Sequence, residues 1–491
     1  MSKGLALWPG GIASDVSGNT FCTEKARPGN IAGKWGTDMR EHCGALILAA
    51  GKGTRMKTDA PKVLVNLLGT PMLWYVRQAL AAVCGENVLA VVGHRADLVE
   101  AAFPDWRDAF VLQSEQRGTG HALAVALPRL RAAGYEYVLV VNGDVPLITA
   151  ADLDEFVETA LAAQVDLAFI TIRLPDPGSY GRVVRRGDIP VIVEAKDYDP
   201  DVHGPGTPEV NAGTYFLRLA AVAPLVDLLT DDNAGREYYI TDLVGLANQA
   251  GLSVLAVDRG TDKTYLGNNT PVELVFSEEI LRRRIVAGHL EAGVIIRAAD
   301  QVRLGPEVVI EPGAELCGPL EIYGRSRIAA GATIASHNVL RDVTVAPGAR
   351  ILSFCHIEEA VIGPNCQVGP YARLRPGAVL MEQAKVGNFV EMKKAVLGRG
   401  SKASHLTYLG DTTVGENANI GAGTITCNYD GKRKHPTTIG DRAFIGSNSA
   451  LVAPIVIGAD TLVGAGSVIT KDVPDGALAV ARSRQMTKPR R

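Results

Sequence analysis

The chain has 491 residues and carries 50 Lys and Arg against 53 Asp and Glu, a formal net charge of −3. This length favours about three structural units. An apolar share of 47% is typical of globular domains and excludes general disorder, while the near-neutral charge argues against bulk electrostatic binding to nucleic acid or to an acidic membrane. Glycine is abundant, with 53 residues, and aromatic residues make up only 5%, which favours β-architecture with frequent tight turns.

Cysteine usage and the lengths of the apolar runs indicate a compartment. The 7 cysteines are scattered and form no CxxC pair, so we expect reduced, mostly buried thiols rather than a disulfide framework or a zinc site. No apolar run approaches the ~18 residues of a membrane span, and the N-terminal segment lacks the apolar core of a signal peptide. We therefore expect a cytoplasmic protein with no membrane partner.

The first 271 residues are predicted to be an extension followed by an α/β domain. Residues 1–43 are rich in Gly, Ser and Thr and predict a flexible extension. From residue 44 to residue 271 short apolar runs alternate with helical patterns, which predicts a mostly parallel sheet with helices on both faces. After about Gly181 the strand patterns become irregular, which indicates a mixed-sheet region. The clearest predicted elements are strand 45–51, helix 71–83, strand 88–93, helix 116–130, strand 137–144, helix 151–163 and strand 166–174.

The rest of the chain is an internal repeat introduced by a helix. Residues 272–293 show the longest helical pattern and predict a helix that links two domains. From residue 294 to residue 491 aliphatic residues recur every six positions, which predicts coils that stack into a parallel β-helix. The register breaks between residues 426 and 439, and an inserted loop of this kind usually marks a binding face. With two one-residue slips before Val368, the repeat positions are Leu304, Ile310, Leu316, Ile322, Ile328, Ile334, Leu340, Val368, Leu374, Leu380, Val386, Ile439, Ile445, Leu451, Ile457, Val463 and Ile469.

A glycine-rich turn directly after the first predicted strand is a candidate phosphate site. Its glycines let backbone N–H groups approach a phosphate without obstruction by Cβ. Arg55 adds a planar cation with several donors, and Lys62 adds a point charge. A plain strand-to-helix turn explains the glycines but not the two cations. Asp144 lies at the carboxyl end of a strand, where α/β sheets bind ligands, although helix capping is an alternative role.

Polar residues interrupt the hexapeptide repeat at 387–394 and 404–411 and make a second candidate site. Acyl transfer to an amine needs a base, and histidine is the side chain best suited to this role near neutrality, so His405 is the natural candidate. From the residues alone, packing at a corner of the solenoid explains His405 equally well. The basic run 432–435 is either a solvated charge cluster or a contact for the phosphates of coenzyme A.

The two candidate sites together resemble a known family. Residues 48–56, LAAGKGTRM, with 61–64, PKVL, resemble the signature of sugar-1-phosphate nucleotidyltransferases. With a hexapeptide domain behind them, the chain is similar from about residue 45 to about residue 485 to the bacterial bifunctional N-acetylglucosamine-1-phosphate uridylyltransferases and glucosamine-1-phosphate acetyltransferases. The resemblance implies a Rossmann-like nucleotidyltransferase domain at 44–271, a linker helix at 272–293 and a left-handed parallel β-helix acetyltransferase domain with a C-terminal tail at 294–491. It also implies a homotrimer with acetyl sites between subunits.

The implied reactions make UDP-N-acetylglucosamine for the bacterial envelope. Acetyl-CoA acetylates glucosamine-1-phosphate, and UTP with Mg²⁺ then uridylylates the product and releases pyrophosphate. The alternative is a monofunctional nucleotidyltransferase with a regulatory or structural β-helix. A structural solenoid has no need for charged groups and a base at its corners, so the polar set favours the acetyltransferase. This set comprises Arg375, Lys393, His405, Tyr408 and Asn428.

The resemblance also assigns roles by position. His405, Arg55 and Lys62 would be catalytic, and Asp144 with Asn268 would hold Mg²⁺. Asn142 departs from the family, whose best-known members have Tyr there. Contacts to UTP and the UDP-sugar would come from Leu48, Ala49, Ala50, Gly51, Lys62, Gln113, Gly118, Thr119, Gly181, Glu194, Asn211 and Asn268. The acetyl acceptor would meet Arg375, Lys393, Tyr408 and Asn419. Acetyl-CoA would meet Ala422, Asn428, Tyr429, Ser447, Ala465 and Arg482, with the Asn428 amide also facing the developing oxyanion.

Overall fold

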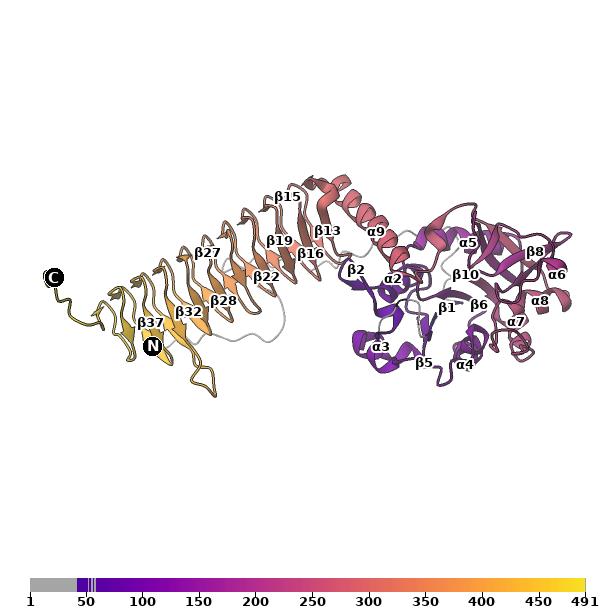
Figure 1. The fold of residues 1–491 in the computed structure, drawn as a ribbon, viewed down its shortest axis with the longest axis horizontal. Helices are drawn as coiled ribbons and strands as arrows, with labels where there is room; N and C mark the ends of the chain where they lie inside the picture. Colours follow the sequence, from indigo (N-terminus) through magenta and orange to yellow (C-terminus); the bar gives the residue numbers. More distant parts are fainter. Residues whose placement is uncertain (1–41, 52, 54–55, 57–58, 491) are drawn as a thin grey trace.

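The computed structural model describes residues 42–51, 53, 56 and 59–490. A globular domain is followed by a long prism, and one helix lies at the joint between them (Figure 1). The predicted extension 1–43 falls almost entirely outside the described residues, as does Arg55, so both predictions stay untested. Among the described cysteines none forms a disulfide, and four are buried: Cys43, Cys84, Cys355 and Cys366.

The globular domain is built on a mostly parallel sheet that has nine strands in the described part of the chain. Its main path runs β11-β7-β10-β6-β1-β4-β5. Strand β10 is antiparallel to both β6 and β7, and β8 and β9 form an antiparallel hairpin beside it, which confirms the predicted mixed region. The strands are β1 Cys43–Ala49, β4 Val88–Val92, β5 Phe110–Leu112, β6 Tyr137–Asn142, β7 Leu167–Arg173, β8 Arg182–Arg186, β9 Ile189–Val193, β10 Glu209–Arg218 and β11 Val254–Asp258, with a small separate pair β2 Asn66–Leu67 and β3 Thr70–Pro71.

Helices cover both faces of this sheet, as the sequence predicts. Neighbouring residues of β1 point to opposite sides: Ile47 packs in the core that contains Leu73 of α2, and Leu46 packs in the core that contains Leu123 of α4. The α-helices are α2 Met72–Cys84, α3 Ala96–Ala102, α4 Thr119–Ala132, α5 Ala150–Ala162, α6 Pro200–His203, α7 Leu219–Val226 and α8 Asp242–Gln249; short 3-10 turns are η2 Lys62–Leu64, η3 Pro104–Ala109, η4 Lys263–Tyr265 and η5 Ala299–Gln301.

Helix α9, Pro271–Glu291, links the two domains where a linker was predicted. Thr270 caps it, with Glu273 completing a capping box. Pro271 is the first helical residue rather than the one before the helix, because a proline at this position loses no intrahelical hydrogen bond. Arg282 is only 6% exposed, and its Nη1 donates to the carbonyl oxygen of Ala299 at 2.8 Å. This hydrogen bond connects the helix to the start of the β-helix.

The second domain is the predicted left-handed parallel β-helix, whose described strands form three sheets. The first sheet comprises β12 Ile295–Arg297, β15 Glu315–Cys317, β18 Thr333–Ile334, β21 Arg350–Ile351, β24 Gln367–Val368, β27 Lys385–Asn388, β30 Lys402–His405, β33 Asn419–Ile420, β36 Phe444–Ile445, β39 Leu462–Val463 and β41 Leu478–Ala479. The second comprises β13 Val302–Leu304, β16 Leu320–Tyr323, β19 Asn338–Arg341, β22 His356–Glu358, β25 Arg373–Leu374, β28 Glu391–Lys393, β31 Tyr408–Gly410, β34 Ile425–Cys427, β37 Ala450–Val452 and β40 Val468–Ile469. The third comprises β14 Val309–Ile310, β17 Arg327–Ile328, β20 Thr344–Val345, β23 Val361–Ile362, β26 Val379–Leu380, β29 Val396–Leu397, β32 Thr412–Val414, β35 Thr437–Ile439 and β38 Ile455–Ile457.

The coils have unequal lengths, which accounts for the slips in the repeat. Leu320 pairs with Asn338, but Val339 pairs with His356, so the later coil is one residue shorter. Ile425 pairs with Ala450 across a much longer coil, and its extra residues form the predicted loop, which protrudes from the prism in Figure 1. We call the turn from the first sheet to the second the first corner, and the turn from the second sheet to the third the second corner.

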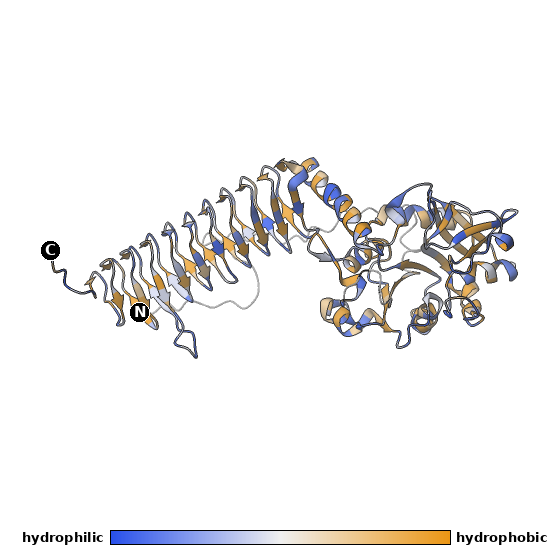
Figure 2. Cartoon of the chain, in the orientation of Figure 1, coloured by the Kyte–Doolittle hydropathy of each residue, from blue (hydrophilic) through white to orange (hydrophobic). Residues whose placement is uncertain are grey.

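Apolar side chains fill the prism from end to end. The predicted repeat positions are buried in one continuous core, and hydrophobic and hydrophilic colours mix along the strands of the prism in Figure 2. Such a core makes each coil dependent on its neighbours.

Leu374 tests this core because it is 0% exposed, whereas Leu462, also on a strand of the β-helix, is 47% exposed. We expect Leu374→Ala to lower the free energy of unfolding by about 2–5 kcal/mol, because a cavity replaces packed methyl groups. The matched variant Leu462→Ala should cost less than about 1 kcal/mol. Urea unfolding of the full chain measures both, and equal losses would contradict the assigned inward direction of Leu374.

Candidate active sites

The first candidate site lies at the carboxyl edge of the parallel sheet. Leu48 near the end of β1 pairs with Asn142 at the end of β6, and the Gly143 N–H donates to the Leu48 carbonyl oxygen at 2.9 Å. Ala49, Ala50 and Gly51 continue from β1, and Asp144 follows β6. Topology therefore brings the predicted phosphate turn and the predicted metal carboxylate together. Arg55 of the same turn lies outside the described residues.

Lys62 and Asp144 form an ion pair in this site. The Lys62 ammonium also donates to Asn269 Oδ1 at 2.8 Å, so one cation bridges a carboxylate oxygen and an amide oxygen. Lys62 is only 9% exposed. A buried ammonium needs such partners, since an unpaired charge away from water is costly.

The residues around Asp144 fit a small oxygen-seeking cation. A Cβ at Gly267 would lie 2.9–3.1 Å from the carboxylate of Asp144, so a larger residue there would crowd this carboxylate. One carboxylate plus an amide oxygen is a donor set that Mg²⁺ accepts when phosphates and water complete its shell. The Lys62 ammonium already contacts one carboxylate oxygen, from Asp144, and one amide oxygen, from Asn269.

Two adjacent asparagines, Asn268 and Asn269, lie near Asp144 and Lys62, and the resemblance assigned a role only to Asn268. Asn268 donates its backbone N–H to the Asp144 carbonyl oxygen at 2.9 Å. Its side chain is 2% exposed; Oδ1 accepts from Ser277 Oγ at 2.7 Å, and Nδ2 faces the sulfur of Met72 at 3.5 Å. The side chain in contact with Lys62 belongs instead to Asn269. Both asparagines are thus candidates for the amide oxygen, and no spacing pattern distinguishes them.

The predicted uracil site is assembled around the start of α4. Gln113 is 2% exposed and donates from Nε2 to the Gly118 carbonyl oxygen at 3.0 Å, with His121 Nδ1 also at 3.0 Å. Gly118 adopts φ 105°, and a Cβ there would lie 2.4 Å from the Tyr238 carbonyl oxygen, so glycine is required. Thr119 Oγ1 accepts from the backbone N–H of Ile240 at 3.0 Å.

The three predicted sugar contacts also lie close together. The Asn211 N–H donates to the Gly181 carbonyl oxygen at 2.9 Å, and a Cβ at Gly181 would be 3.5 Å from the Glu194 carboxylate. Thr241 Oγ1 donates to Glu194 Oε1 at 2.9 Å. Burial raises the pKa of Glu194, with further contributions from nearby carboxylates. Asn142, which departs from the family, lies against Gly213, where a Cβ would meet Nδ2 at 2.2 Å.

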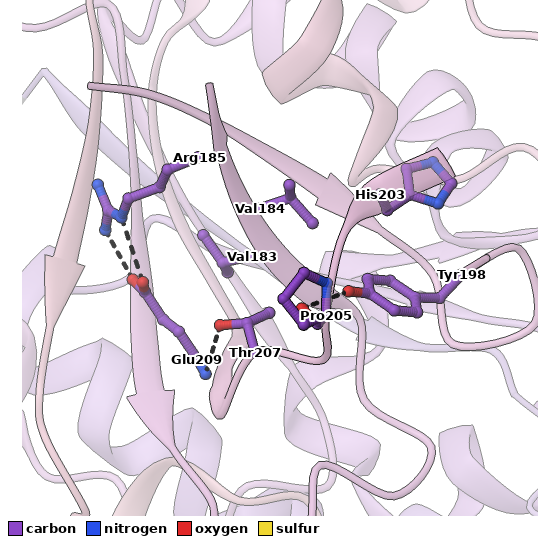
Figure 3. A pocket seen from close by; sticks show the side chains of 8 residues that line it. All are labelled: Val183, Val184, Arg185, Tyr198, His203, Pro205, Thr207 and Glu209. Atoms are coloured by element: carbon purple, nitrogen blue, oxygen red, sulfur yellow. Dashed lines mark hydrogen bonds and ion pairs between the residues drawn. The ribbon is translucent and has the colours of Figure 1, made fainter. Parts of the chain in front are cut away.

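A hollow of about 260 Å³ beside β8 contains none of the predicted residues (Figure 3). Arg185 on its wall donates from Nη2 to Glu209 Oε1 at 2.7 Å, and the Tyr198 hydroxyl donates to the Pro205 carbonyl oxygen at 3.1 Å. Its polar groups therefore satisfy one another, and the hollow offers no obvious charge for a ligand.

The second candidate site follows the first corner of the β-helix. His405 is exposed at the end of β30, and its Nδ1 lies 2.6 Å from Oδ1 of Asn388, one coil earlier at a separation of 17 residues. Neither the motifs nor the resemblance assigned Asn388 a role, although the coil period places it in register with His405.

Three predicted acetyl-CoA contacts continue along the same corner. Ala422, Ser447 and Ala465 occupy the first corner of successive later coils. The close spacing of these coils depends on glycine: a Cβ at Gly421 would lie 2.6 Å from the Ser447 nitrogen, and one at Gly446 would lie 2.4 Å from the Ala465 nitrogen. The result is a strip of small residues that begins at His405.

Two further predicted acetyl-CoA contacts lie after the last described strand, at Arg482, and in the protruding loop, at Tyr429. Arg482 donates from Nη1 to the Ala465 carbonyl oxygen at 2.8 Å. Tyr429 is 60% exposed at the base of the protruding loop, and its hydroxyl donates to the Gly431 carbonyl oxygen at 2.7 Å.

Cations gather at the second corner, on the adjoining face. The side chains of Lys393 and Lys434 are close enough for their hydrogen bond and charge repulsion to lower the pKa of Lys393, and Arg375 adds to the effect. Arg375 donates to Glu391 Oε1 at 2.8 Å. The basic loop therefore brings Lys434 to the predicted sugar-phosphate residues, whereas the sequence suggested only solvent or coenzyme A as its contact.

Polar groups beside these cations complete the face. A Cβ at Gly410 would lie 2.5 Å from the Tyr408 hydroxyl and 2.6 Å from Nδ2 of Asn428, so the two side chains meet over this glycine. Asn428 donates to Asp411 Oδ2 at 2.6 Å, which uses one of its two N–H groups. Asn419 begins β33 one coil after Lys402.

The pKa of Asp242 provides a test of the environment around the sugar residues. Burial and the charge of Asp197 raise this pKa to about 6. Since the ordinary value is about 3.9, the folded state holds a proton that the unfolded chain loses. The contribution of this group to stability is therefore complete below about pH 4 and is lost as the pH rises through about 6. We expect Asp242→Asn to be more stable than wild type at about pH 8 and equally stable at about pH 4, measured by urea unfolding. An equal difference at both pH values would contradict this assignment.

Comparisons with known proteins agree with the fold and with the order of the two sites. The MobA-like NTP transferase domain matches residues 45–189, and the hexapeptide repeat of succinyl-transferase matches residues 436–471. The bifunctional protein GlmU of Nitratidesulfovibrio vulgaris is 58% identical over 454 residues, which cover 92% of this chain and 99% of that relative.

Two further relatives extend the comparison. The bifunctional protein GlmU of Oleidesulfovibrio alaskensis is 56% identical, and that of Thermus thermophilus is 46% identical; each match covers 90% of this chain and 96% of the relative. Within the described residues, no helix is long and apolar enough to cross a membrane. The chain belongs to the family of bifunctional GlmU proteins, which confirms the family that the sequence motifs indicate.

Proposed function

We propose that this chain makes UDP-N-acetylglucosamine in two steps, acetylating glucosamine-1-phosphate with acetyl-CoA and then uridylylating the product with UTP. The observation that carries the proposal is the first corner, where His405, oriented by Asn388, begins a strip of small residues, with the cations of the second corner on the adjoining face. A regulatory or purely structural β-helix, the alternative, has no use for such a group of residues. We also propose that the reactions take place in the cytoplasm, without a nucleic-acid or membrane partner.

Acetyl transfer requires a base that is held in one tautomer. With a proton on Nδ1, His405 donates to Asn388 Oδ1, and Nε2 keeps the free lone pair that a base needs. The amine nitrogen of the sugar attacks the thioester carbonyl, its proton passes to Nε2, and the thiolate of coenzyme A leaves. The second N–H of the Asn428 amide is available to the developing oxyanion.

The cations at the second corner suit the sugar phosphate. Arg375, Lys393 and Lys434 meet without enough carboxylates to neutralise them all, and the lowered pKa of Lys393 reflects this repulsion. A dianionic phosphate between them would relieve it. We therefore assign Lys434 to the phosphate of glucosamine-1-phosphate rather than to coenzyme A. Tyr408 and Asn419 would hold the sugar ring.

Uridylyl transfer depends on charge neutralisation between two anions. Asp144 and the asparagine pair 268–269 would hold Mg²⁺, which supplies charge for the triphosphate and the leaving pyrophosphate. Lys62 is in contact with the same oxygens, so its ammonium can turn from Asp144 to the phosphates once another cation holds the carboxylate. Gln113, Gly118 and Thr119 would read the uracil, and Gly181, Glu194 and Asn211 would line the sugar pocket.

We also propose that the chain works as a homotrimer joined along the first corner. Upstream of His405 this corner carries an aromatic ladder, which we define as His337, Phe354, Tyr371 and Phe389. Successive rings stack with centroids 4.8, 4.9 and 5.5 Å apart. All four residues have positive φ, where bulky side chains are strained by about 1–2 kcal/mol each. Three of the rings are 47–57% exposed, so a partner chain would bury them beside the acetyl site.

The proposed function is tested with purified protein, glucosamine-1-phosphate, acetyl-CoA, UTP and Mg²⁺, with products resolved by mass spectrometry. Wild type should make UDP-N-acetylglucosamine. We expect His405→Ala to slow acetyl transfer roughly 10²–10⁴-fold, because the base is lost. That variant should still convert added N-acetylglucosamine-1-phosphate, whereas Asp144→Asn should acetylate but not uridylylate.

If wild type itself requires preformed N-acetylglucosamine-1-phosphate, the bifunctional proposal fails and the monofunctional alternative replaces it. If His405→Ala acetylates at the wild-type rate, the acetyl site lies elsewhere.

The aromatic ladder predicts a separate effect on assembly. Replacing Phe354 and Tyr371 together by serine should lower the mass of the particle, measured by sedimentation, because the exposed rings lose their contact area. Acetyl transfer should fall with the mass, and uridylyl transfer should persist. The control is Val456→Ser, a residue 49% exposed on the third sheet, which should change neither property. If the particle of the double variant keeps the wild-type mass, the aromatic ladder does not form the interface between chains.

A further inference from the structure

The ammonium of Lys62 is held by two different kinds of oxygen. It forms the ion pair with Asp144 and donates to Asn269 Oδ1 at 2.8 Å. The aliphatic part of the side chain packs against Gly53 of the glycine-rich turn, where a Cβ would lie 2.5 Å from Lys62 Cβ. The lysine therefore lies between the predicted phosphate turn and the predicted metal carboxylate, and Asn269 is its uncharged partner.

The Asn269 side chain presents its oxygen to the lysine in a fixed orientation. Its Nδ2 donates to the carbonyl oxygen of Gly267 at 3.1 Å. Because a carbonyl can only accept and an ammonium can only donate, reversing the amide would break both hydrogen bonds. The backbone of Asn269 is also fixed, since its N–H donates to Glu273 Oε2 at 2.7 Å in the first turn of α9. The start of the linker helix thus builds the acceptor for Lys62.

An amide and a carboxylate have different consequences for a lysine that acts on phosphates. A carboxylate neutralises the ammonium and also attracts metal ions, so Asp144 can pair with Lys62 or with a divalent cation. An amide oxygen holds the ammonium by a hydrogen bond and leaves its net positive charge. Within the described residues, Asp144 and Asn269 are the two hydrogen-bond partners of the Lys62 ammonium. When another cation occupies the carboxylate of Asp144, Asn269 still holds the lysine.

We propose that Asn269 is a positioning residue of the uridylyl site, which holds the Lys62 ammonium beside the phosphate turn and leaves its charge available to the phosphates of UTP. This inference rests on the proposed function and deepens it. Misplacing a group at the reacting centre by about 1 Å can cost about 100-fold in rate. The loss should therefore appear in kcat and should act through Lys62.

The kinetic test compares uridylyl transfer by the full-length chain at saturating UTP, N-acetylglucosamine-1-phosphate and Mg²⁺. We expect Asn269→Ala to lower kcat about 10- to 100-fold and to leave KM for UTP unchanged. In a Lys62→Met background, which keeps a long side chain without the charge, the same change should have no further effect. Asn269→Asp keeps an acceptor but neutralises the ammonium, so it should not restore the rate.

Two measurements without turnover report separately on the lysine and on the metal. Labelling of the substrate-free protein with acetic anhydride, followed by mass spectrometry, should modify Lys62 several times faster in Asn269→Ala than in wild type, because the buried ammonium has lost one of its partners. The dissociation constant for Mn²⁺, measured by electron paramagnetic resonance with UDP-N-acetylglucosamine present, should be unchanged, because Asn269 serves the lysine rather than the metal.

A matched control separates this effect from the general loss of an asparagine side chain. Asn248 is half-buried, as Asn269 is, and its Nδ2 also donates to a carbonyl oxygen, that of Pro190, at 2.7 Å. Asn248→Ala should therefore change neither kcat nor the labelling of Lys62. Thermal unfolding of each variant verifies that the domain is folded.

The outcomes distinguish this inference from the proposed function. If wild type transfers uridylyl groups and Asn269→Ala has the same kcat, the positioning role is wrong and the proposed function stands. If Asn269→Ala lowers kcat by the same factor with and without the Lys62 ammonium, or weakens Mn²⁺ binding as much as Asp144→Asn does, the asparagine does not act through the lysine and the inference is overturned. If wild type makes no UDP-N-acetylglucosamine from preformed N-acetylglucosamine-1-phosphate, both proposals fail.

Discussion

An inward-pointing aliphatic side chain every six residues is the constraint on which the second domain depends. Leu374, Met392 and Leu409 stack in one column of the core, because their strands pair in register. Their neighbours must then point outward, which brings Arg375 above Lys393 on the same face. The same register aligns Asn388 with His405 at the first corner. The chemistry of the surface is therefore arranged by the packing of the interior.

In the first domain the corresponding constraint is that the carboxyl ends of neighbouring parallel strands lie at the same edge of the sheet. Parallel strands β1 and β6 finish at one edge, so a glycine-rich turn and Asp144 meet although they are distant in sequence. The asparagine pair 268–269 precedes helix α9, and Glu273 and Ser277 of that helix hydrogen-bond to it. The same helix bonds to the start of the β-helix through Arg282. One element thus supports a ligand site at its first turns and a domain joint further along.

Periodic features were predictable from the sequence, and isolated polar contacts were not. The repeat positions, the linker helix and the protruding loop follow from spacing alone, because burial imposes a period. Asn388 was within reach of the same logic, one coil before His405. Asn269, Ser277 and Lys434 were not, because their partners are brought near by folding and no period marks them. The family resemblance named Asn268, but only the structure relates its amide to Ser277.

A crystal structure of the chain with coenzyme A, UDP-N-acetylglucosamine and Mg²⁺ would test the account most directly. We expect a metal bound by Asp144 and an amide oxygen of the asparagine pair 268–269, with Lys62 turned toward the phosphates. We also expect coenzyme A along the strip from His405 to Ala465, with a neighbouring chain against the aromatic ladder. Coenzyme A bound away from the first corner, or a metal that does not contact Asp144, would contradict the account.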